Sequence, residues 1–141
     1  MSSAPTASEQ PAIYVDTSAF VKLVIREAES DALRDKLRTL KQVLISSALL
    51  EVEAMRAARH VGLAGRAIAD LEEALDEILL LGMTDAIRRR AKYVDPSSLR
   101  SLDAIHLATA LEADVDVMVA YDQRLGKAAR ANGIAVMSPG A

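Results

Sequence analysis

Two aspartates directly follow short apolar runs that are typical of β-strands. Asp16 comes after the run 12–15, and Asp122 comes after the run 117–121. Ligands of open α/β sheets bind at the carboxyl ends of the strands, so both acids stand where a site is expected. A buried carboxylate is costly unless it is paired or bound to a metal ion. Either acid alone could simply cap the following helix, but two on one sheet edge favour a shared site.

A third acid, Asp103, lies in a segment of mostly small and apolar residues, 99–110. At helical spacing Asp103 shares a face with Leu107 and Ala110, where an acid is unexpected unless the face lines a site. Its place near the helix start favours the ionised carboxylate through the helix dipole. The ordinary alternative is a first-turn acid that only complements this dipole.

A fourth acid comes from the segment 46–57, which contains both Glu51 and Glu53. Residues two apart on a helix point roughly 200° from each other, so only one of the pair can face a shared site. Both flank the apolar stripe of this helix, on opposite sides. The helical phase therefore leaves the pair undecided.

The chemistry open to these acids is limited by what the chain lacks. It has no cysteine and only two histidines, His60 and His106. This excludes disulfides, thiolate zinc sites, iron–sulfur clusters and cysteine nucleophiles. A bound metal ion would be held by oxygen atoms, which favours Mg²⁺ or Mn²⁺. We expect His106 to be a packing residue outside the site and His60 to interact with the dipole at a helix end.

The elements that position these residues are short strands alternating with helices. Strands are expected over 12–15, 43–45, 79–81, 117–121 and 134–137, and helices over 18–26, 30–41, 46–60, 67–78, 85–93, 101–113 and 124–131. This alternation indicates βα units and a parallel sheet covered on both faces. The expected fold class is α/β, a three-layer α/β/α sandwich with a short, mostly parallel sheet. Ser30 and Thr84 are the expected N-caps of their helices, and the run 79–81 is expected to be buried.

The length of 141 residues fits one domain, predicted over 12–141 after a disordered tail over 1–11. No apolar run reaches the roughly 18 residues of a membrane helix, and the tail lacks the features of a signal peptide. We therefore expect no membrane contact and a cytoplasmic protein. The net charge of −3 argues against a broadly basic surface, but four acids bound to metal would leave the other charges nearly balanced.

Four short motifs occur in order along nearly the whole chain, from about residue 13 to 139. They are Asp16-Thr17-Ser18-Ala19, Ser47-Ala48-Leu49 leading to Glu53-Ala54-Met55-Arg56-Ala57, Leu102-Asp103-Ala104-Ile105-His106-Leu107-Ala108, and Tyr121-Asp122-Gln123-Arg124-Leu125. Together they resemble the motifs of PIN-domain ribonucleases, specifically VapC-type toxins. In that family the glutamate lies six residues after the serine of a Ser-Ala-Leu segment, which from Ser47 selects Glu53.

The resemblance implies a PIN-like fold and a metal-dependent endoribonuclease, the toxin of a toxin–antitoxin pair. It implies Asp16 and Asp103 as principal ligands of Mg²⁺ or Mn²⁺, with Glu53 and Asp122 binding directly or through water. One or two such ions could activate a water molecule and neutralise charge on the RNA phosphodiester. An antitoxin partner and a homodimer are also implied.

Several neighbouring polar residues have two interpretations. Thr17 and Ser18 could orient Asp16 or touch a phosphate, although Ser18 could equally be a plain N-cap. Arg100 and Arg124 lie near acids in sequence and could bind RNA phosphates, with solvated surface side chains as the competing account.

Other functions fit less well. A PIN-like binding scaffold without turnover is the alternative, but its signature would be a missing acid, and all four are present. A haloacid-dehalogenase-like phosphatase needs a second aspartate two residues after the first, where Ser18 stands. A receiver domain needs an acidic pair at the first strand, which Asp16 does not provide.

Overall fold

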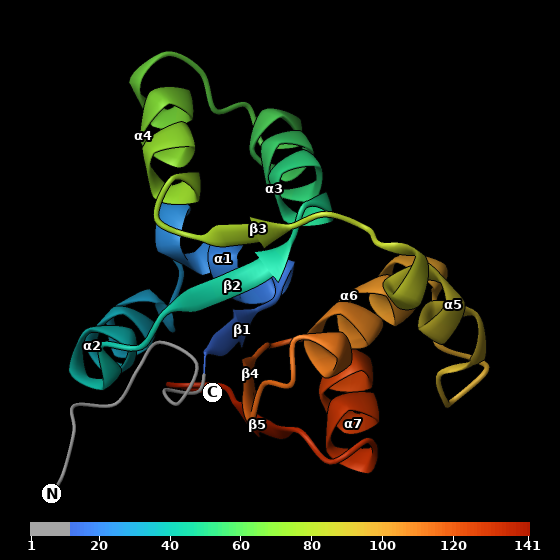
Figure 1. The fold of residues 1–141 in the computed structure, drawn as a ribbon. Coiled ribbons are helices and arrows are strands. Elements are labelled where there is room, and N and C mark those ends of the chain that lie inside the picture. The colour runs from blue at the N-terminus through green and yellow to red at the C-terminus, as the bar shows by residue number, and fades with distance from the viewer. Residues whose placement is uncertain (1–11) are drawn as a thin grey trace, which may run out of the picture.

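The computed structural model describes residues 12–141, so the tail predicted over 1–11 lies outside the described residues. The elements follow in the order β1 (Ile13–Val15), α1 (Thr17–Val24), α2 (Ser30–Leu40), β2 (Leu44–Ser47), α3 (Leu49–His60), α4 (Arg66–Leu75), β3 (Leu79–Leu81), α5 (Asp85–Tyr93), α6 (Ser101–Glu112), β4 (Val117–Val119), α7 (Gln123–Ala131) and β5 (Ala135–Met137). The strands form one sheet in the order β3-β2-β1-β4-β5, and every pairing is parallel (Figure 1).

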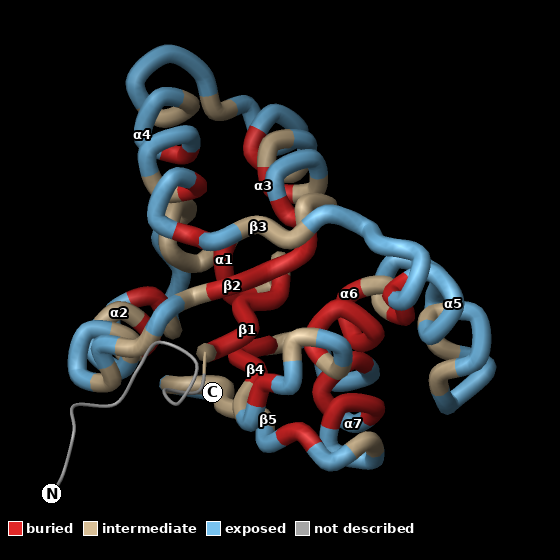
Figure 2. The backbone as a smooth tube through the Cα atoms, in the orientation of Figure 1, coloured by how far each residue is buried: buried red, intermediate tan, exposed pale blue. Residues whose placement is uncertain are grey.

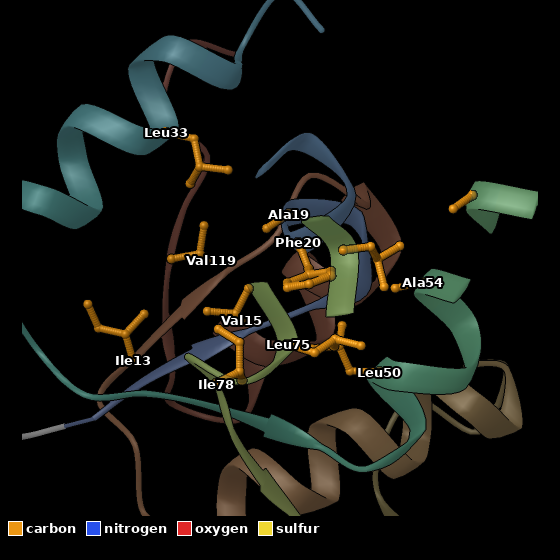
Figure 3. Close-up of a cluster of buried hydrophobic side chains, with 12 residues drawn as sticks. Ile13, Val15, Ala19, Phe20, Leu33, Leu50, Ala54, Leu75, Ile78 and Val119 are labelled. Atoms are coloured by element: carbon orange, nitrogen blue, oxygen red, sulfur yellow. The ribbon is translucent and has the colours of Figure 1, made fainter. Parts of the chain in front are cut away.

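The residues of β1 alternate between the two faces of the sheet, which gives the fold its layers. Ile13 and Val15 join a buried cluster with side chains from α1, α2, α3 and α4 (Figure 3). Tyr14 points to the other face and joins a second cluster with α6 and α7. Side chains of successive strand residues point to opposite faces, so a continuous apolar run is the pattern of a strand covered on both sides. The predicted three-layer α/β/α architecture is confirmed.

The central strand is the most buried part of the molecule (Figure 2). Tyr14 of β1 pairs with Ile45 of β2 on one side and with Met118 of β4 on the other. In the sheet, β2 and β3 lie on the far side of β1, and β5 lies on the far side of β4. The chain order thus reverses between β1 and β4, and ligands of this class of sheet bind at the carboxyl ends of two such strands.

Several predictions about element ends were wrong, first at the helix predicted over 46–60, because Ser46 and Ser47 belong to β2 and α3 begins at Leu49. Ser30 does not cap α2 but is its first residue, and its hydroxyl accepts a hydrogen bond from the Glu27 amide at 2.9 Å. The strand β4 ends at Val119, two residues before the predicted end. The reason is that the Tyr121 amide donates to the Ser18 hydroxyl at 2.9 Å instead of joining a strand.

Thr84 caps α5 as predicted, accepting from the Ile87 amide at 3.1 Å. The run 79–81 does form a strand, but its predicted burial was wrong, since Leu79 is 57% exposed. As β3 is an edge strand, it has a neighbour on one side only. Among residues 12–141, no helix is long and apolar enough to span a bilayer.

Candidate active site

The carboxyl ends of β1 and β4 bring Asp16 and Asp122 to the same edge of the sheet. Asp16 immediately follows β1, is only 4% exposed, and its amide donates to the Val119 carbonyl at 3.0 Å. Asp122 lies three residues after β4 and is exposed. Both also cap helices, Asp16 for α1 and Asp122 for α7, where it accepts from the Leu125 amide at 3.0 Å. Capping and a place at the site are therefore not alternatives in this fold.

Ser18 joins these two strand ends. Its hydroxyl donates to Asp16 Oδ2 at 2.7 Å and accepts from the amides of Tyr121 at 2.9 Å and Asp122 at 3.3 Å. The amide of Ser18 also donates to Asp16 Oδ2, at 3.2 Å. Ser18 is thus more than the plain N-cap considered from the sequence, because it fixes Asp16 against a segment more than 100 residues away.

Glu53 is the acid of α3 that faces this edge, whereas Glu51 is exposed. One oxygen of Glu53, Oε1, accepts from the Thr17 hydroxyl at 2.9 Å and from His106 Nε2 at 2.6 Å. Burial alone would raise the pKa of Glu53, but the hydrogen bond and charge of His106 outweigh it, so the pKa is lowered. Glu53 is therefore held as a carboxylate.

His106, expected from the sequence to be a packing residue outside the site, is buried and lies beside two of the candidate acids, Glu53 and Asp16. It is 1% exposed, and Nε2 lies 4.0 Å from Asp16 Oδ1 as well as bonding to Glu53. Nδ1 meets the buried Tyr14 hydroxyl at 2.6 Å. Burial would lower the pKa of His106, but the acids around Nε2 more than compensate and raise it. The signal in the sequence was its position one turn after Asp103, together with a tyrosine in the central strand.

Asp103 lies in the first turn of α6 and is half-buried. Burial raises its pKa above the ordinary value, and the charges of Asp122, Asp16 and, more weakly, Glu53 raise it further. Four carboxylates from four parts of the chain are thus close enough to repel one another. All are oxygen donors of the kind that bind Mg²⁺ or Mn²⁺.

The donor chemistry fits a divalent cation, although the side chains do not converge on one point. Among residues 12–141, no three acids or histidines are grouped closely enough to hold an ion as they are placed. One cause is visible at Glu53, which is turned toward Thr17 and His106.

A groove of about 750 Å³ opens beside Asp103, between the start of α6, the segment before it, and α7. Its lining residues are Asp95, Pro96, Ser98, Leu99, Arg100, Asp103, Arg124, Lys127, Ala128, Ala131 and Asn132. The two arginines predicted near the acids thus line one groove with Asp103. Sequence analysis missed Lys127, which lies one turn after Arg124 on the same helix. We call these three cations the groove cations.

Comparison with known proteins agrees with this architecture. A family model described as PIN domain matches residues 13–131. The ribonuclease VapC46 of Mycobacterium tuberculosis is 45% identical over 130 residues, covering 91% of this chain and 98% of that protein. This chain belongs to the PIN-domain family of VapC ribonucleases. VapC35 of the same organism is 46% identical over 136 residues, covering 91% of this chain and 97% of its own. PIN-domain ribonucleases generally depend on a divalent metal ion.

Solved VapC and toxin structures share the fold. M. tuberculosis VapC20, described as a toxin that cleaves the sarcin–ricin loop, superposes with a TM-score of 0.70 at 18% identity, covering 90% of this chain and 99% of that one. A toxin–antitoxin complex from Klebsiella pneumoniae gives a TM-score of 0.67 at 18% identity, covering 90% of this chain and 97% of that one.

Proposed function

We propose that this VapC-family chain is a divalent-metal-dependent endoribonuclease that acts as the toxin of a toxin–antitoxin pair. The observation that carries the proposal is that Asp103 lies near enough to Asp122, Asp16 and Glu53, from three other parts of the chain, for their charges to raise its pKa. Burial first, and then the charges of Asp122 and Asp16, raise the pKa of Asp103, and a bound cation would offset both effects. The VapC relatives named above are ribonucleases at 45% and 46% identity.

Asp16 and Asp103 are the proposed principal ligands of Mg²⁺ or Mn²⁺, with Glu53 and Asp122 binding directly or through water. When bound, such an ion polarises a phosphate oxygen and makes a water molecule more acidic. Asp122 Oδ1 is already engaged by the Leu125 amide, which favours a contact through water or through its other oxygen. Glu53 is likewise occupied at one oxygen only.

The protein's own contribution is to hold these acids ready. Ser18 fixes Asp16, and Thr17 fixes Glu53, in each case through a hydroxyl that donates to the carboxylate. Fixed donors and acceptors lower the reorganisation that hydrolysis would otherwise require. Ser18 and Thr17 therefore act as positioning residues in this proposal.

The groove cations are the proposed contact for the RNA strand on either side of the cleaved bond. Guanidinium groups of Arg100 and Arg124 suit bidentate contact with phosphate, and Lys127 adds a third positive charge. Apolar groups of Leu99 and Ala128 in the same groove suit the flat face of a base or a ribose. The three exposed cations localise positive charge beside Asp103 in a chain whose net charge is −3.

The partners proposed for this chain are an RNA substrate, an antitoxin protein and a second copy of the chain. The antitoxin is supported by the toxin–antitoxin complex of similar fold. The homodimer follows from the family resemblance. A cytoplasmic location is proposed because a toxin acting on the cell's own RNA meets it there. The alternative of an inactive scaffold is not favoured, because Asp16, Glu53, Asp103 and Asp122 are all retained.

The test compares wild type with Asp103→Asn, each expressed in bacteria and purified. We expect growth arrest and Mg²⁺-dependent RNA cleavage from wild type, both lost in Asp103→Asn. Asp116→Asn is the matched control, since Asp116 is an exposed acid at the opposite end of β4 and should leave both readouts unchanged. Equal toxicity and cleavage from wild type and Asp103→Asn would refute the catalytic assignment.

A further inference from the structure

His106 is a buried histidine with both ring nitrogens hydrogen-bonded, on a helix that the site already uses. Nδ1 lies 2.6 Å from the Tyr14 hydroxyl, and Nε2 lies 2.6 Å from Glu53 Oε1. The Tyr14 and His106 rings meet edge to face, with centroids 5.8 Å apart and planes at 82°. Tyr14 is itself fully buried in the central strand. Neither residue can move without disturbing the core.

The direction of the hydrogen bonds follows from the groups involved. A carboxylate only accepts, so Nε2 carries a hydrogen and donates to Glu53. A hydroxyl both donates and accepts, so Tyr14 satisfies Nδ1 whether or not that nitrogen carries a hydrogen. The Tyr14 oxygen is fixed in turn by the Ser47 amide, which donates to it at 3.1 Å. A continuous line of hydrogen bonds thus runs from β2 through β1 and α6 to Glu53 on α3.

This line reaches Glu53 at one oxygen only. Oε1 accepts from both His106 and Thr17, while Oε2 accepts no hydrogen bond from any residue within 12–141. His106 Nε2 also lies 4.0 Å from Asp16 Oδ1, so the ring is close to two of the proposed ligands. The arrangement fixes the carboxylate group and leaves one oxygen available.

We propose that Tyr14 and His106 are positioning residues that hold Glu53 by one oxygen so that the other is available to a divalent cation. The inference rests on the proposed function, in which Glu53 takes part in binding that cation. Hydrogen-bond partners of metal-binding carboxylates typically contribute 10- to 100-fold to metal affinity or activity. Thr17, exposed in part, would be the weaker of the two contacts on Oε1, since its bond is the longer one.

The test is Mn²⁺ affinity of the intact protein without RNA, measured by electron paramagnetic resonance titration. His106→Leu removes the donor at similar volume, and we expect Mn²⁺ to bind roughly 10- to 100-fold more weakly. His106→Gln keeps an N–H donor that can reach Glu53, and it should restore most of the affinity. Tyr14→Phe should fall between them. His60→Leu, the same change at an exposed histidine, should bind Mn²⁺ like wild type.

A second readout can be made on the wild-type protein, with Glu53→Gln as an added comparison. In ¹⁵N-detected spectra of wild type, the His106 Nε2 hydrogen should be protected from exchange, and Glu53→Gln should weaken that protection. Rapid exchange in wild type would overturn the inference. So would wild-type Mn²⁺ affinity in folded His106→Leu, or equal losses in His106→Leu and His106→Gln, which would mean that only packing matters.

Steady-state cleavage separates this inference from the proposed function. We expect His106→Leu to lower kcat with little change in KM, because RNA contacts lie in the groove and not at His106. If Asp103→Asn still cleaves RNA, the proposed function fails, while the Mn²⁺ and exchange measurements still decide the role of His106. If Asp103→Asn is inactive and His106→Leu is unaffected in Mn²⁺ affinity and kcat, only the positioning role fails.

Discussion

The four acids divide into a fixed pair and an open pair. Asp16 and Glu53, the fixed pair, are buried or half-buried, and each accepts from a neighbouring hydroxyl at 2.9 Å or less. Asp103 and Asp122, the open pair, lie at the starts of α6 and α7, and Asp103 lines the groove. Hydrogen bonds to a carboxylate favour its charged form, whereas burial and like charges oppose it.

The two pairs differ in what they contribute to the candidate site: the fixed pair contributes preset geometry, and the open pair contributes charge near the groove. The fixed pair has its geometry set by the fold before any ligand arrives, which lowers the cost of organising the site. In the open pair, burial and the charges of neighbouring acids raise the pKa of Asp103, which also lines the groove together with the groove cations. Substitutions in the fixed pair should therefore act through geometry, and those on the open side through charge and substrate contact.

After the loss expected for Asp103→Asn, the largest effect is expected from Glu53→Gln, which removes one of the two charges of the fixed pair. We expect RNA cleavage with Mg²⁺ to fall by at least about 100-fold, the upper end of effects seen for residues that merely support a metal ligand. Cleavage rates of purified protein at saturating RNA provide the measurement. Glu51→Gln is the matched control two residues away on an exposed position of the same helix. Similar losses in both variants would mean that Glu53 has no special role.

Ser18→Ala breaks the connection that fixes Asp16. It removes the donor to Asp16 Oδ2 and the acceptor of the Tyr121 amide. A buried polar group left without its partner costs about 1–3 kcal/mol, so we expect the free energy of unfolding in urea to fall by that amount. Ser97→Ala, at an exposed serine, should change it by less than about 0.5 kcal/mol. Equal stability of the two variants would contradict the role given to Ser18.

Arg124→Gln and Lys127→Gln test the open side. In a binding assay with Ca²⁺ in place of Mg²⁺, chosen so that the RNA is not cleaved, each variant should bind single-stranded RNA several-fold more weakly than wild type. Each should also lower the slope of log affinity against log salt by about 0.7 if it removes one phosphate contact. Arg89→Gln removes an exposed cation from α5 and should leave the slope unchanged. If the slope is unaltered in both groove variants, RNA does not bind along this groove.

The smallest effect is expected on the Tm of Asp103→Asn, which should rise and not fall as it does in most core substitutions. The raised pKa of Asp103 means that the folded state binds its proton more tightly than the unfolded state, so Asp103 destabilises the fold as pH rises above the ordinary value of 3.8. With EDTA present, Asp103→Asn should have a slightly higher Tm than wild type at pH 7. That difference should shrink as the pH falls and vanish below pH 3.8, where Asp103 is protonated in both states. A lower Tm for Asp103→Asn at pH 7 would show that repulsion does not dominate there.

The sequence was sufficient for the layers of the fold and for most of the acids, since both follow from local patterns. Alternating apolar runs predict βα units, and acids directly after strands predict the edge where Asp16 and Asp122 lie. Periodicity could not decide between Glu51 and Glu53, because they flank the apolar stripe of the helix on opposite sides. Only the family resemblance selected Glu53, which the structure places against Thr17 and His106.

Long-range hydrogen bonds account for what the sequence did not predict. The hydrogen bond between Ser18 and Tyr121 joins residues 103 positions apart in the chain. The bond between His106 and Tyr14 joins residues 92 positions apart, and no local sequence pattern predicts such pairs. The early end of β4 has the same origin, because a side chain took the place of a strand partner. The place of Lys127 in the groove could not be predicted without knowing that α7 packs beside α6.

The contact between Ser18 and Tyr121 also has a consequence for translation. Residues 13–15 leave the ribosome long before residues 117–119, yet β1 pairs with β4 along its full length. A nascent or prematurely terminated chain that stops before residue 117 lacks the neighbour that supports Asp16, and it also lacks Asp122. An interrupted chain would therefore lack two parts of the candidate site, the support that β4 gives to Asp16 and the carboxylate of Asp122.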